Sequence, residues 1–488
     1  MHGTKHAALP RSAAWRRRPA RKAYIDGAPS DDEPLTALAE LRALLLAALP
    51  IGAVQIGLVS MGTVDTLMVG RLSAEALGGV ALGNWWKIAW LTLGQGSLMV
   101  LDGVISEAIG ARDNEAIGSN LVRGMVLALI YSILLAPTFL GCAVSLGLLG
   151  QPSSLLPLAG QYATVQIMSI LPTLGFVVMR SAFQAVGSLR PVLLSVILAN
   201  LLNPFLNYAL IWGLPRFGIP AMGAIGSAWA TVLCSWVLFL ALPLLGRRVI
   251  SQYIPDRSGA RDCIKLRPML RLAALGLPVG LHQFTESVAF AVMMLLVGAF
   301  GVTAVASHQV AISMASIPWN VALGISAAAA VRVGRAVGRK DPDAVRRACR
   351  ISVSTGAGMM VGWSALMIFW PTTLARVWSS DPGVVAMAAS LLPIAGAFGI
   401  SDGVQTVASG VLRGLLDTRG LVTAALLGYW AVGTPASLLL SHTLGFGAKG
   451  VWWGMVLGLS CTAGLVLARV RRNMKNANKL CAQVELVQ

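Results

Sequence analysis

The sequence predicts an all-α integral membrane protein, in which twelve transmembrane helices form two parallel six-helix lobes. Three observations predict this fold. The composition is strongly apolar, twelve apolar runs are each long enough to cross a bilayer, and the two halves of the chain repeat one another. Strands are not expected, because the runs are too long and do not alternate between apolar and polar residues.

The composition excludes most classes of soluble protein. Of the 488 residues, 56% are hydrophobic and only 12% are charged, which is about half the charged share of a typical soluble domain. The mean hydropathy is +0.73. The six cysteines form no CxxC pair and show no zinc-like spacing, so neither a disulfide scaffold nor a metal site is expected from them.

The individual helices follow from the length of each apolar run. An α-helix crosses the hydrocarbon core with roughly 20 apolar residues. The second and tenth runs also contain charged residues. The twelve runs lie near residues 42–69, 77–101, 121–148, 157–179, 192–213, 221–245, 273–298, 303–331, 350–371, 385–412, 420–441 and 450–468.

The distribution of Lys and Arg predicts the orientation of these helices. If the N-terminus is cytoplasmic, 33 of the 38 Lys and Arg fall in cytoplasmic segments, four fall outside, and Lys87 lies within the second run. This excess obeys the positive-inside rule. It explains the net charge of +18 without a nucleic acid as partner. We therefore expect a multi-pass protein of the plasma membrane (the inner membrane in a bacterium), with both termini cytoplasmic.

The runs and charges divide the chain into five parts. They are a basic and acidic cytoplasmic tail (1–40), an N-lobe (41–245), a cytoplasmic linker (246–271), a C-lobe (272–469) and a second cytoplasmic tail (470–488). The basic residues of the first tail are expected to contact anionic lipid headgroups, and the alternative is that they bind a partner.

The two lobes are predicted to be copies of one another. Six helices in each lobe is an even number, so both lobes run the same way through the bilayer. Such a parallel repeat about an axis along the membrane normal is common in transporters. Residues that match at a constant offset of 228 include Pro50 and Pro278, Gly52 and Gly280, Gln55 and Gln283, Gly110 and Gly338, Arg112 and Lys340, and Asp113 and Asp341.

Three acidic residues, Asp65, Glu286 and Asp402, lie deep inside apolar runs. A carboxylate at mid-bilayer costs about 2.5–3.5 kcal/mol on insertion scales, so such residues face the bundle interior or water. They are either structural hydrogen-bonding or ion-pairing groups, or a site that exchanges a proton or metal cation with a cationic substrate. Three such residues in one chain favour the second interpretation. Asp102 and Glu107, near the cytoplasmic end of the second run, are expected at the membrane interface.

Two basic residues share these runs with the acids. Lys87, within NWWKIAW, either snorkels to the interface or pairs with Asp65. If it pairs, Asp65 stays ionised and is less useful for proton exchange. His282 precedes Glu286 by four residues on one helix face, so the two form either a proton relay or a plain hydrogen-bonded pair.

Several longer motifs complete the pattern. They are P-x4-Q-x8-VDTLMVG from Pro50, NPFLNYALIWG from Asn203, PVGLHQFTESVAFAVMMLLVGAFG from Pro278, ASHQVAISMASIPWNVALGISAAAAVRVGRAVG from Ala306 and DGVQTVASGVLRGLLDTRG from Asp402. In these motifs the chain resembles the multidrug and toxic compound extrusion (MATE) family, in its NorM-like branch. The resemblance covers about residues 38–470 in order.

The resemblance implies a MATE/MOP-like fold with a central cavity and export by alternating access, driven by a proton or Na⁺ gradient. It implies that Asp65 is the acidic residue of the N-lobe. It also implies that Glu286 and Asp402 are the acidic pair of the C-lobe, where the coupling cation acts. Na⁺ is therefore possible at Glu286 and Asp402, and no other metal or cofactor is implied.

Other polar positions are candidates for the cavity. The resemblance implies that Asn203 and Asn207 face the N-lobe cavity, and that the pair His308 and Gln309 is a hallmark of the family. The chain departs from the family pattern at Gln184, where many relatives have an acidic residue. It departs also at Lys87 and His282, which are atypical candidates for the cavity. Taken together, the polar candidates for the cavity are Asn203, Asn207, His308, Gln309, His282 and Lys87.

We therefore expect a secondary active antiporter, functional as a monomer, that exports organic cations or other amphiphilic small molecules in exchange for H⁺ or Na⁺. The alternative is a lipid-linked precursor flippase or polysaccharide exporter of the same superfamily. Such a protein would need a cavity rich in Arg, whereas intramembrane Arg is nearly absent from the runs. An enzyme is not expected, because the five His, two of them in the first tail, form no catalytic cluster.

Overall fold

The computed structural model describes residues 36–253 and 263–482. Most of the predicted first tail, part of the linker and the end of the second tail lie outside the described residues. Within these two ranges the chain is helical apart from turns, loops and one isolated bridge between Leu214 and Ile219. Twelve helical stretches are long and apolar enough to cross a membrane, which confirms the predicted fold class.

The first six spans occupy the first half of the chain. Short elements at the ends of the spans are α5 (Cys142–Leu148), η1 (Pro215–Phe217) and α9 (Arg247–Ile250). The spans themselves are α1 (Ala37–Val69), α2 (Ala74–Leu98) with its continuation α3 (Leu101–Gly110), α4 (Asn114–Leu140), α6 (Leu156–Val186), α7 (Arg190–Ile211) and α8 (Ala224–Leu245).

The other six spans occupy the second half. The short helices α14 (Pro371–Trp378) and α19 (Ala477–Ala482) flank them. The eleventh span consists of α16 (Arg419–Ala425), η2 (Leu426–Gly433), α17 (Thr434–Leu438) and η3 (Leu439–Thr443), of which η2 and η3 are π-helical. The remaining spans are α11 (Leu266–Gly298), α12 (Val302–Gly338), α13 (Pro342–Phe369), α15 (Pro382–Gly414) and α18 (Gly447–Lys475).

Equivalent residues of the predicted repeat begin equivalent helices. Asp113 caps α4 by accepting a hydrogen bond from the Ala116 amide, and Asp341 caps α13 by accepting one from the Ala344 amide. Each capping carboxylate thus provides an acceptor for a backbone amide that has no partner within its own helix. The residue before each cap, Arg112 or Lys340, has a left-handed φ of 58°.

Several helices extend beyond the predicted runs. The second span continues through α3 to Gly110, and the ninth begins at Pro342 rather than near residue 350. Polar side chains lower the hydropathy there, although they do not interrupt the helix. The run predicted over 121–148 is divided, because α4 ends at Leu140 and the short helix α5 follows.

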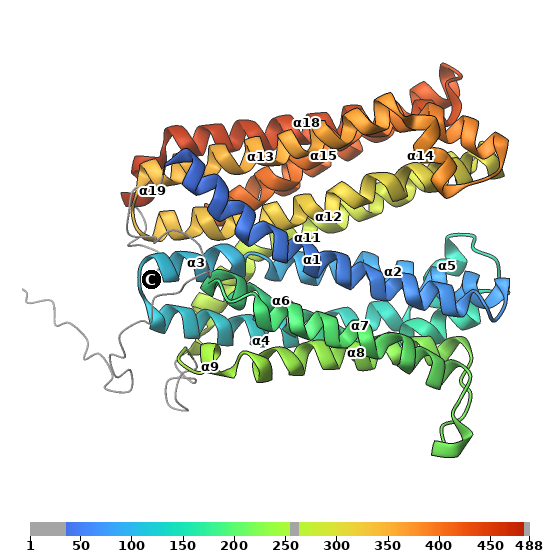
Figure 1. Ribbon diagram of the computed structural model, residues 1–488, viewed down its shortest axis with the longest axis horizontal. Coiled ribbons are helices and arrows are strands. Elements are labelled where there is room, and N and C mark those ends of the chain that lie inside the picture. The colour runs from blue at the N-terminus through green and yellow to red at the C-terminus, as the bar shows by residue number, and fades with distance from the viewer. Residues whose placement is uncertain (1–35, 254–262, 483–488) are drawn as a thin grey trace, which may run out of the picture.

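The helices form two groups, which lie one above the other in Figure 1. We call α2 to α8 the N-lobe and α12 to α18 the C-lobe, and α1 and α11 cross between them. The first part of α1 packs against α12 and α13, and its second part packs against α7 and α8. Likewise, α11 packs against α2 of the N-lobe and against α12, α16 and α18 of the C-lobe.

Glycines allow both crossings. Gly52 of α1 lies against Gly324 of α12, and Gly280 of α11 lies against Gly96 of α2. A side chain at Gly324 or Gly96 would meet the backbone of the other helix. Small residues let helix backbones approach closely in membrane proteins. The two crossings are equivalent, because each residue of one pair is 228 positions from its counterpart in the other.

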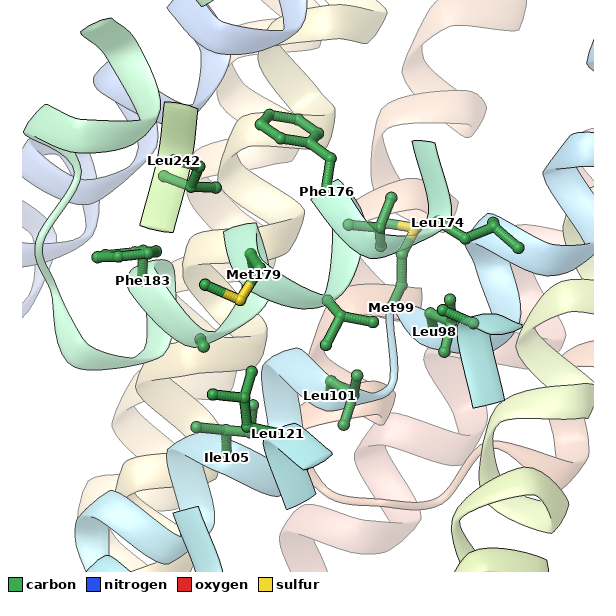
Figure 2. Packing of buried hydrophobic residues seen from close by; sticks show 14 of the residues in the cluster. Leu98, Met99, Leu101, Ile105, Leu121, Leu174, Phe176, Met179, Phe183 and Leu242 are labelled. Carbon is green, nitrogen blue, oxygen red and sulfur yellow. The ribbon is translucent and has the colours of Figure 1, made fainter. Parts of the chain in front are cut away.

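Both ends of the described chain lie at one end of the molecule, which we call the terminal end (Figure 1). The two lobes meet toward this end and spread apart toward the opposite end. Figure 2 shows part of the core on the N-lobe side, where Leu101 and Ile105 of α3 and Leu121 of α4 pack near Phe183 of α6 and Leu242 of α8. This apolar packing fixes α3 in the lobe while its other face meets α12.

Candidate functional site

Asp65 lies in the N-lobe side of the structure as the centre of a hydrogen-bonded group. One carboxylate oxygen, Oδ1, accepts bonds from Nδ2 of Asn203 (2.8 Å) and Nδ2 of Asn207 (2.6 Å). The other, Oδ2, accepts a bond from the Thr231 hydroxyl at 2.9 Å. Asp65 is buried, as are the two asparagines. Two helices, α7 and α8, thus place three neutral donors on the acid of α1.

Lys87 lies on the face of α2 that points into the N-lobe. Gly83 and Gly94 share this face and are buried against α6. Lys87 attracts Asp65 electrostatically, but in the described ranges it forms no ion pair with that acid. Pairing of Lys87 with Asp65 was one of the two predicted alternatives; the structure shows the two charges in the same lobe without direct contact.

Glu286 of the crossing helix α11 and Asp402 of α15 lie together on the C-lobe side of the structure. The Tyr429 hydroxyl donates a hydrogen bond of 2.8 Å to Glu286. Asp402 is 5% exposed and is close enough to Glu286 for the two charges to repel each other. Thr406, one turn beyond Asp402, has its hydroxyl 3.5 Å from the Asp402 carboxylate. The two acids therefore form one electrostatic unit with neutral partners.

The predicted relation between His282 and Glu286 takes a different form. His282 Nε2 lies 3.0 Å from the amide nitrogen of Gln405, and Gln405 Oε1 lies 3.4 Å from the Tyr429 hydroxyl. Gln405 and Tyr429 therefore connect His282 to Glu286, and no direct bond joins the two in the described ranges. Tyr429 lies in the π-helical segment η2, whose wider turn is typical of functional sites.

None of the three predicted acids has a basic partner within the described part of the chain. The same residues contain no group of three or more His, Cys, Asp or Glu arranged to hold a metal. The oxygen atoms near Glu286 and Asp402 are the carboxylates and the groups of Tyr429, Gln405 and Thr406. Oxygen ligands suit a hard cation, so these groups fit either a proton or Na⁺.

The predicted pair His308 and Gln309 lies away from these contacts. Gln309 is exposed on α12. His308 is buried, and its ring lies 5.4 Å from Trp452. From there, ring contacts run through Phe398 and Phe290 to Tyr429. His308 is thus linked to the acidic pair by aromatic packing and not by hydrogen bonds.

Buried charges also fill the seam between the lobes at the terminal end. Asp102 of α3 is 1% exposed and lies near the guanidinium groups of Arg413 and Arg180. Glu107 is buried as well and is attracted by Arg271. The second lobe covers both side chains, and the expectation that Asp102 and Glu107 lie at the membrane interface stays a prediction.

Buried arginines gather at the ends of the spanning helices near the terminal end. Four arginines lie buried in the last two turns of spanning helices, among the residues that the sequence analysis counts as cytoplasmic, so the expectation that intramembrane Arg is nearly absent stays a prediction. Arg332 forms two hydrogen bonds with Glu40, of 2.9 and 2.5 Å, and none of the four forms an ion pair with Glu286 or Asp402. The four are Arg180, Arg332, Arg335 and Arg413.

Sequence reasoning missed the hydroxyl and amide partners of the acids. Thr231, Gln405 and Tyr429 lie in apolar runs, where Thr and Tyr have many structural uses. Gln405 could have been found, because it lies three residues after Asp402, on the same side of the helix. Gln184, noted as a departure from the family, is buried with both amide atoms unpartnered in the described ranges.

Comparisons with known proteins agree with this arrangement. The sequence model of the MatE family matches residues 50–209 and 278–439. The chain is 36% identical over 403 residues to the multidrug resistance protein NorM of Burkholderia vietnamiensis, covering 80% of this chain and 85% of that protein. It is 30% identical over 399 residues to the multidrug resistance protein MdtK of Proteus mirabilis, covering 80% and 86%. Both relatives are named as multidrug resistance proteins.

Solved structures show the same fold. The eukaryotic MATE transporter AtDTX14 superposes with a TM-score of 0.84 at 22% identity, covering 93% of this chain and all of that chain. A multidrug resistance MATE transporter of the MOP superfamily, described as outward-facing, gives a TM-score of 0.79 at 21% identity, covering 91% and 99%. With the two family matches beginning at equivalent prolines of the repeat, Pro50 and Pro278, the chain belongs to the MatE family of multidrug and toxic compound extrusion transporters.

Proposed function

We propose that this protein expels organic cations and other amphiphilic small molecules by antiport against H⁺ or Na⁺. The observation that carries the proposal is the pair Glu286 and Asp402, a half-buried and a buried acid that lie close together with only neutral hydrogen-bond partners in the described residues. Two like charges in a low-dielectric site repel each other strongly. A proton or Na⁺ that enters the site relieves this repulsion, and so does a cationic substrate.

Competition between the ion and the substrate for Glu286 and Asp402 couples the entry of the ion to the export of the substrate. When a proton or Na⁺ neutralises Glu286 and Asp402, the site no longer attracts a cationic substrate. When the ion leaves, the site attracts the substrate again. Uphill export then follows from the downhill entry of the ion, provided that the site faces one side of the membrane at a time.

The contact between the lobes supports such alternating access. The lobes meet at the terminal end, where backbone lies on backbone at the glycine crossings and buried charges fill the seam. We assign this end to the cytoplasm, because the described helix ends found there adjoin the segments predicted to be cytoplasmic, which contain 33 of the 38 Lys and Arg. The arrangement described is then closed toward the cytoplasm of a plasma membrane. One chain carries both lobes, so we expect a monomer to be functional.

Transport in proteoliposomes tests the proposal. The purified full chain is reconstituted, and export of a fluorescent organic cation is followed under a pH gradient and under a Na⁺ gradient, imposed separately. One of the gradients should accelerate export, and the double variant Glu286→Gln with Asp402→Asn should abolish the acceleration. Asp343→Asn is the matched control, because Asp343 is an exposed acid, with 74% of its side chain accessible.

Two results would contradict the proposal. One is export by the double variant at the rate of the unaltered protein, which would remove the acids from the coupling step. The other is the absence of acceleration by both gradients, which would exclude secondary antiport of this cation.

A further inference from the structure

The seam between the lobes at the terminal end contains one acid near two bases, one from each lobe. Asp102 is on α3 and Arg180 is on α6, both in the N-lobe, whereas Arg413 is on α15 of the C-lobe. All three side chains are buried. The backbones also touch here, because a Cβ at Gly103, next to Asp102, would meet the main-chain carbonyl of Arg413. Asp102 is thus held at the boundary between the two lobes.

Each of the two guanidinium groups has only neutral hydrogen-bond partners in residues 36–253 and 263–482. Nη1 of Arg180 donates a 2.8 Å bond to Oε1 of Gln55, and Nη2 of Arg413 lies 3.3 Å from the Ser326 hydroxyl. In the same residues, neither guanidinium forms an ion pair with Asp102 at 4.0 Å or less. Asp102 therefore attracts the two positive charges through space.

The balance of these charges favours contact between the lobes. Arg413 attracts Asp102 more strongly than Arg180 does, although Arg180 lies in the same lobe as Asp102. Arg413 is in turn attracted by Asp102 and, to a smaller extent, repelled by Arg180. Such interactions are stronger between buried groups than in water, because the effective dielectric constant is lower. One acid thus turns a repulsion between two arginines across the seam into a net attraction.

We infer that Asp102 is the residue that holds the protein closed toward the cytoplasm, by attracting Arg413 across the seam and by offsetting the repulsion between Arg180 and Arg413. The inference rests on the alternating access of the proposed function. When the lobes separate at this end, the attraction is lost, but water then hydrates all three charged groups. Because burial of charges costs hydration free energy, the two effects oppose each other. The closed and open arrangements therefore stay close enough in free energy to interconvert.

Alkylation of a cysteine placed in the seam reports its opening. Ser106 is fully buried, one turn after Asp102 on α3, and its Cβ lies against Gly334 of α12 in the other lobe. Ser106→Cys replaces one oxygen by sulfur and should react with a water-soluble maleimide only when the lobes separate. Mass spectrometry of the purified full chain gives the rate for the peptide that contains residue 106. The native Cys142 and Cys349, both fully buried in the cores of the structure, report any general loss of folding.

On this background, Asp102→Asn should raise the alkylation rate of residue 106 at least about 10-fold, because unbalanced like charges strongly disfavour an interface. Adding Arg413→Gln removes the repulsion and should return the rate most of the way to that of the background. A role of Asp102 in packing alone would not be rescued in this way. Arg180→Gln by itself should lower the rate, because the attraction between Asp102 and Arg413 is then unopposed.

Asp417→Asn is the matched control at the same end of the molecule. It removes a half-buried acid whose ion-pair partner, Arg469, belongs to the same lobe. The alkylation rate of residue 106 should therefore stay that of the background, since no attraction across the seam is lost.

Three results would overturn the inference: an unchanged rate at residue 106 in Asp102→Asn, an equal acceleration with and without Arg413→Gln, or no slowing in Arg180→Gln. If Asp102→Asn also exposes the two native cysteines, Arg180→Gln alone decides, and a rate that does not fall contradicts the inference. The measurement needs neither a substrate nor a gradient. Gradient-driven export with an unchanged seam would therefore contradict only the role of Asp102, and an opened seam without such export would contradict only the antiport.

Discussion

The α-carbon of Gly110 faces the main-chain carbonyl of Arg335, and no side chain fits between them. The equivalent residue of the second half, Gly338, faces the carbonyl of Glu107 in the same way. Each glycine is 228 residues from the other, and so is each carbonyl. The seam at the terminal end is therefore a self-complementary contact between equivalent stretches of backbone.

A methyl group at this seam should push the lobes apart. Gly338→Ala adds a Cβ that would meet the Glu107 carbonyl, which is main chain and cannot rotate away. Overpacking of this kind costs about 1–3 kcal/mol, so the closed arrangement should lose population by roughly 5- to 150-fold. Double electron–electron resonance between spin labels on the two lobes at the terminal end measures this shift.

Gly358→Ala is the control for the seam, because a Cβ there meets only open space. Its distance distribution should match that of the unaltered protein. If Gly338→Ala gave that same distribution, the close approach of the two backbones would not be what limits their separation.

The donors around Asp65 should stabilise the folded N-lobe. Asn207→Ala removes the 2.6 Å bond to the carboxylate, and a hydrogen bond to a charged group contributes about 1.5–3 kcal/mol. The thermal unfolding midpoint in detergent should therefore fall. Asn320→Ala is the comparison, since Asn320 bonds only to a carbonyl one turn away on its own helix. An equal fall of the unfolding midpoint in the two variants would mean that the charge of Asp65 adds nothing to the stability that these hydrogen bonds give.

Hydropathy located the twelve spans because each run must satisfy its backbone within the bilayer. It could not locate every helix end. The α3 helix and the start of α13 carry polar side chains that lower the hydropathy but continue the helix. The caps at Asp113 and Asp341 could have been recognised, because Asp is a favoured N-cap residue.

Breaking the Glu40–Arg332 pair should destabilise the contact between α1 and α12. Both side chains are buried and are joined by two hydrogen bonds. Removing one partner leaves an uncompensated charge, which costs about 3–5 kcal/mol, whereas replacing both with apolar residues costs far less. Thermal unfolding of Glu40→Leu, Arg332→Met and the double variant tests this as a double-mutant cycle. Additive effects would exclude direct coupling.

Asp417, in the loop before α16, should make stability depend on acid pH. Burial alone would raise the pKa of Asp417, but hydrogen bonds from Arg469 and Asn473 and the nearby positive charges hold that pKa below its ordinary value. A lowered folded pKa stabilises the protein fully above the unfolded value, near pH 4, and this stabilisation disappears as the pH falls through the folded value.

The unfolding midpoint, measured from pH 7 down to about pH 3, should show this loss for the unaltered protein and a smaller one for Asp417→Asn. Asp343→Asn changes an exposed acid with a single ion-pair partner and should keep the pH dependence. Identical slopes for all three proteins would assign the acid sensitivity to other groups.

The site could be predicted only in part. Asp65, Glu286 and Asp402 were identified because a carboxylate in an apolar run is rare and costly. Asp102 and Glu40 could not be identified, because their burial depends on the second lobe, and the hydropathy of one helix carries no information about its neighbours. The position of Lys87 was predicted, but its separation from Asp65 depends on three donors contributed by two other helices.

The crossing of α1 into the other lobe also constrains how the protein is made. Glu40 and Arg332 are 292 residues apart, so α1 is synthesised long before the helix on which its first part rests. Until α12 has been inserted, Glu40 has no guanidinium and the glycine face of α1 has no backbone to cover it. The N-terminal half produced by itself therefore remains incomplete, and the two halves, expressed as separate polypeptides, must assemble together before either reaches its final packing.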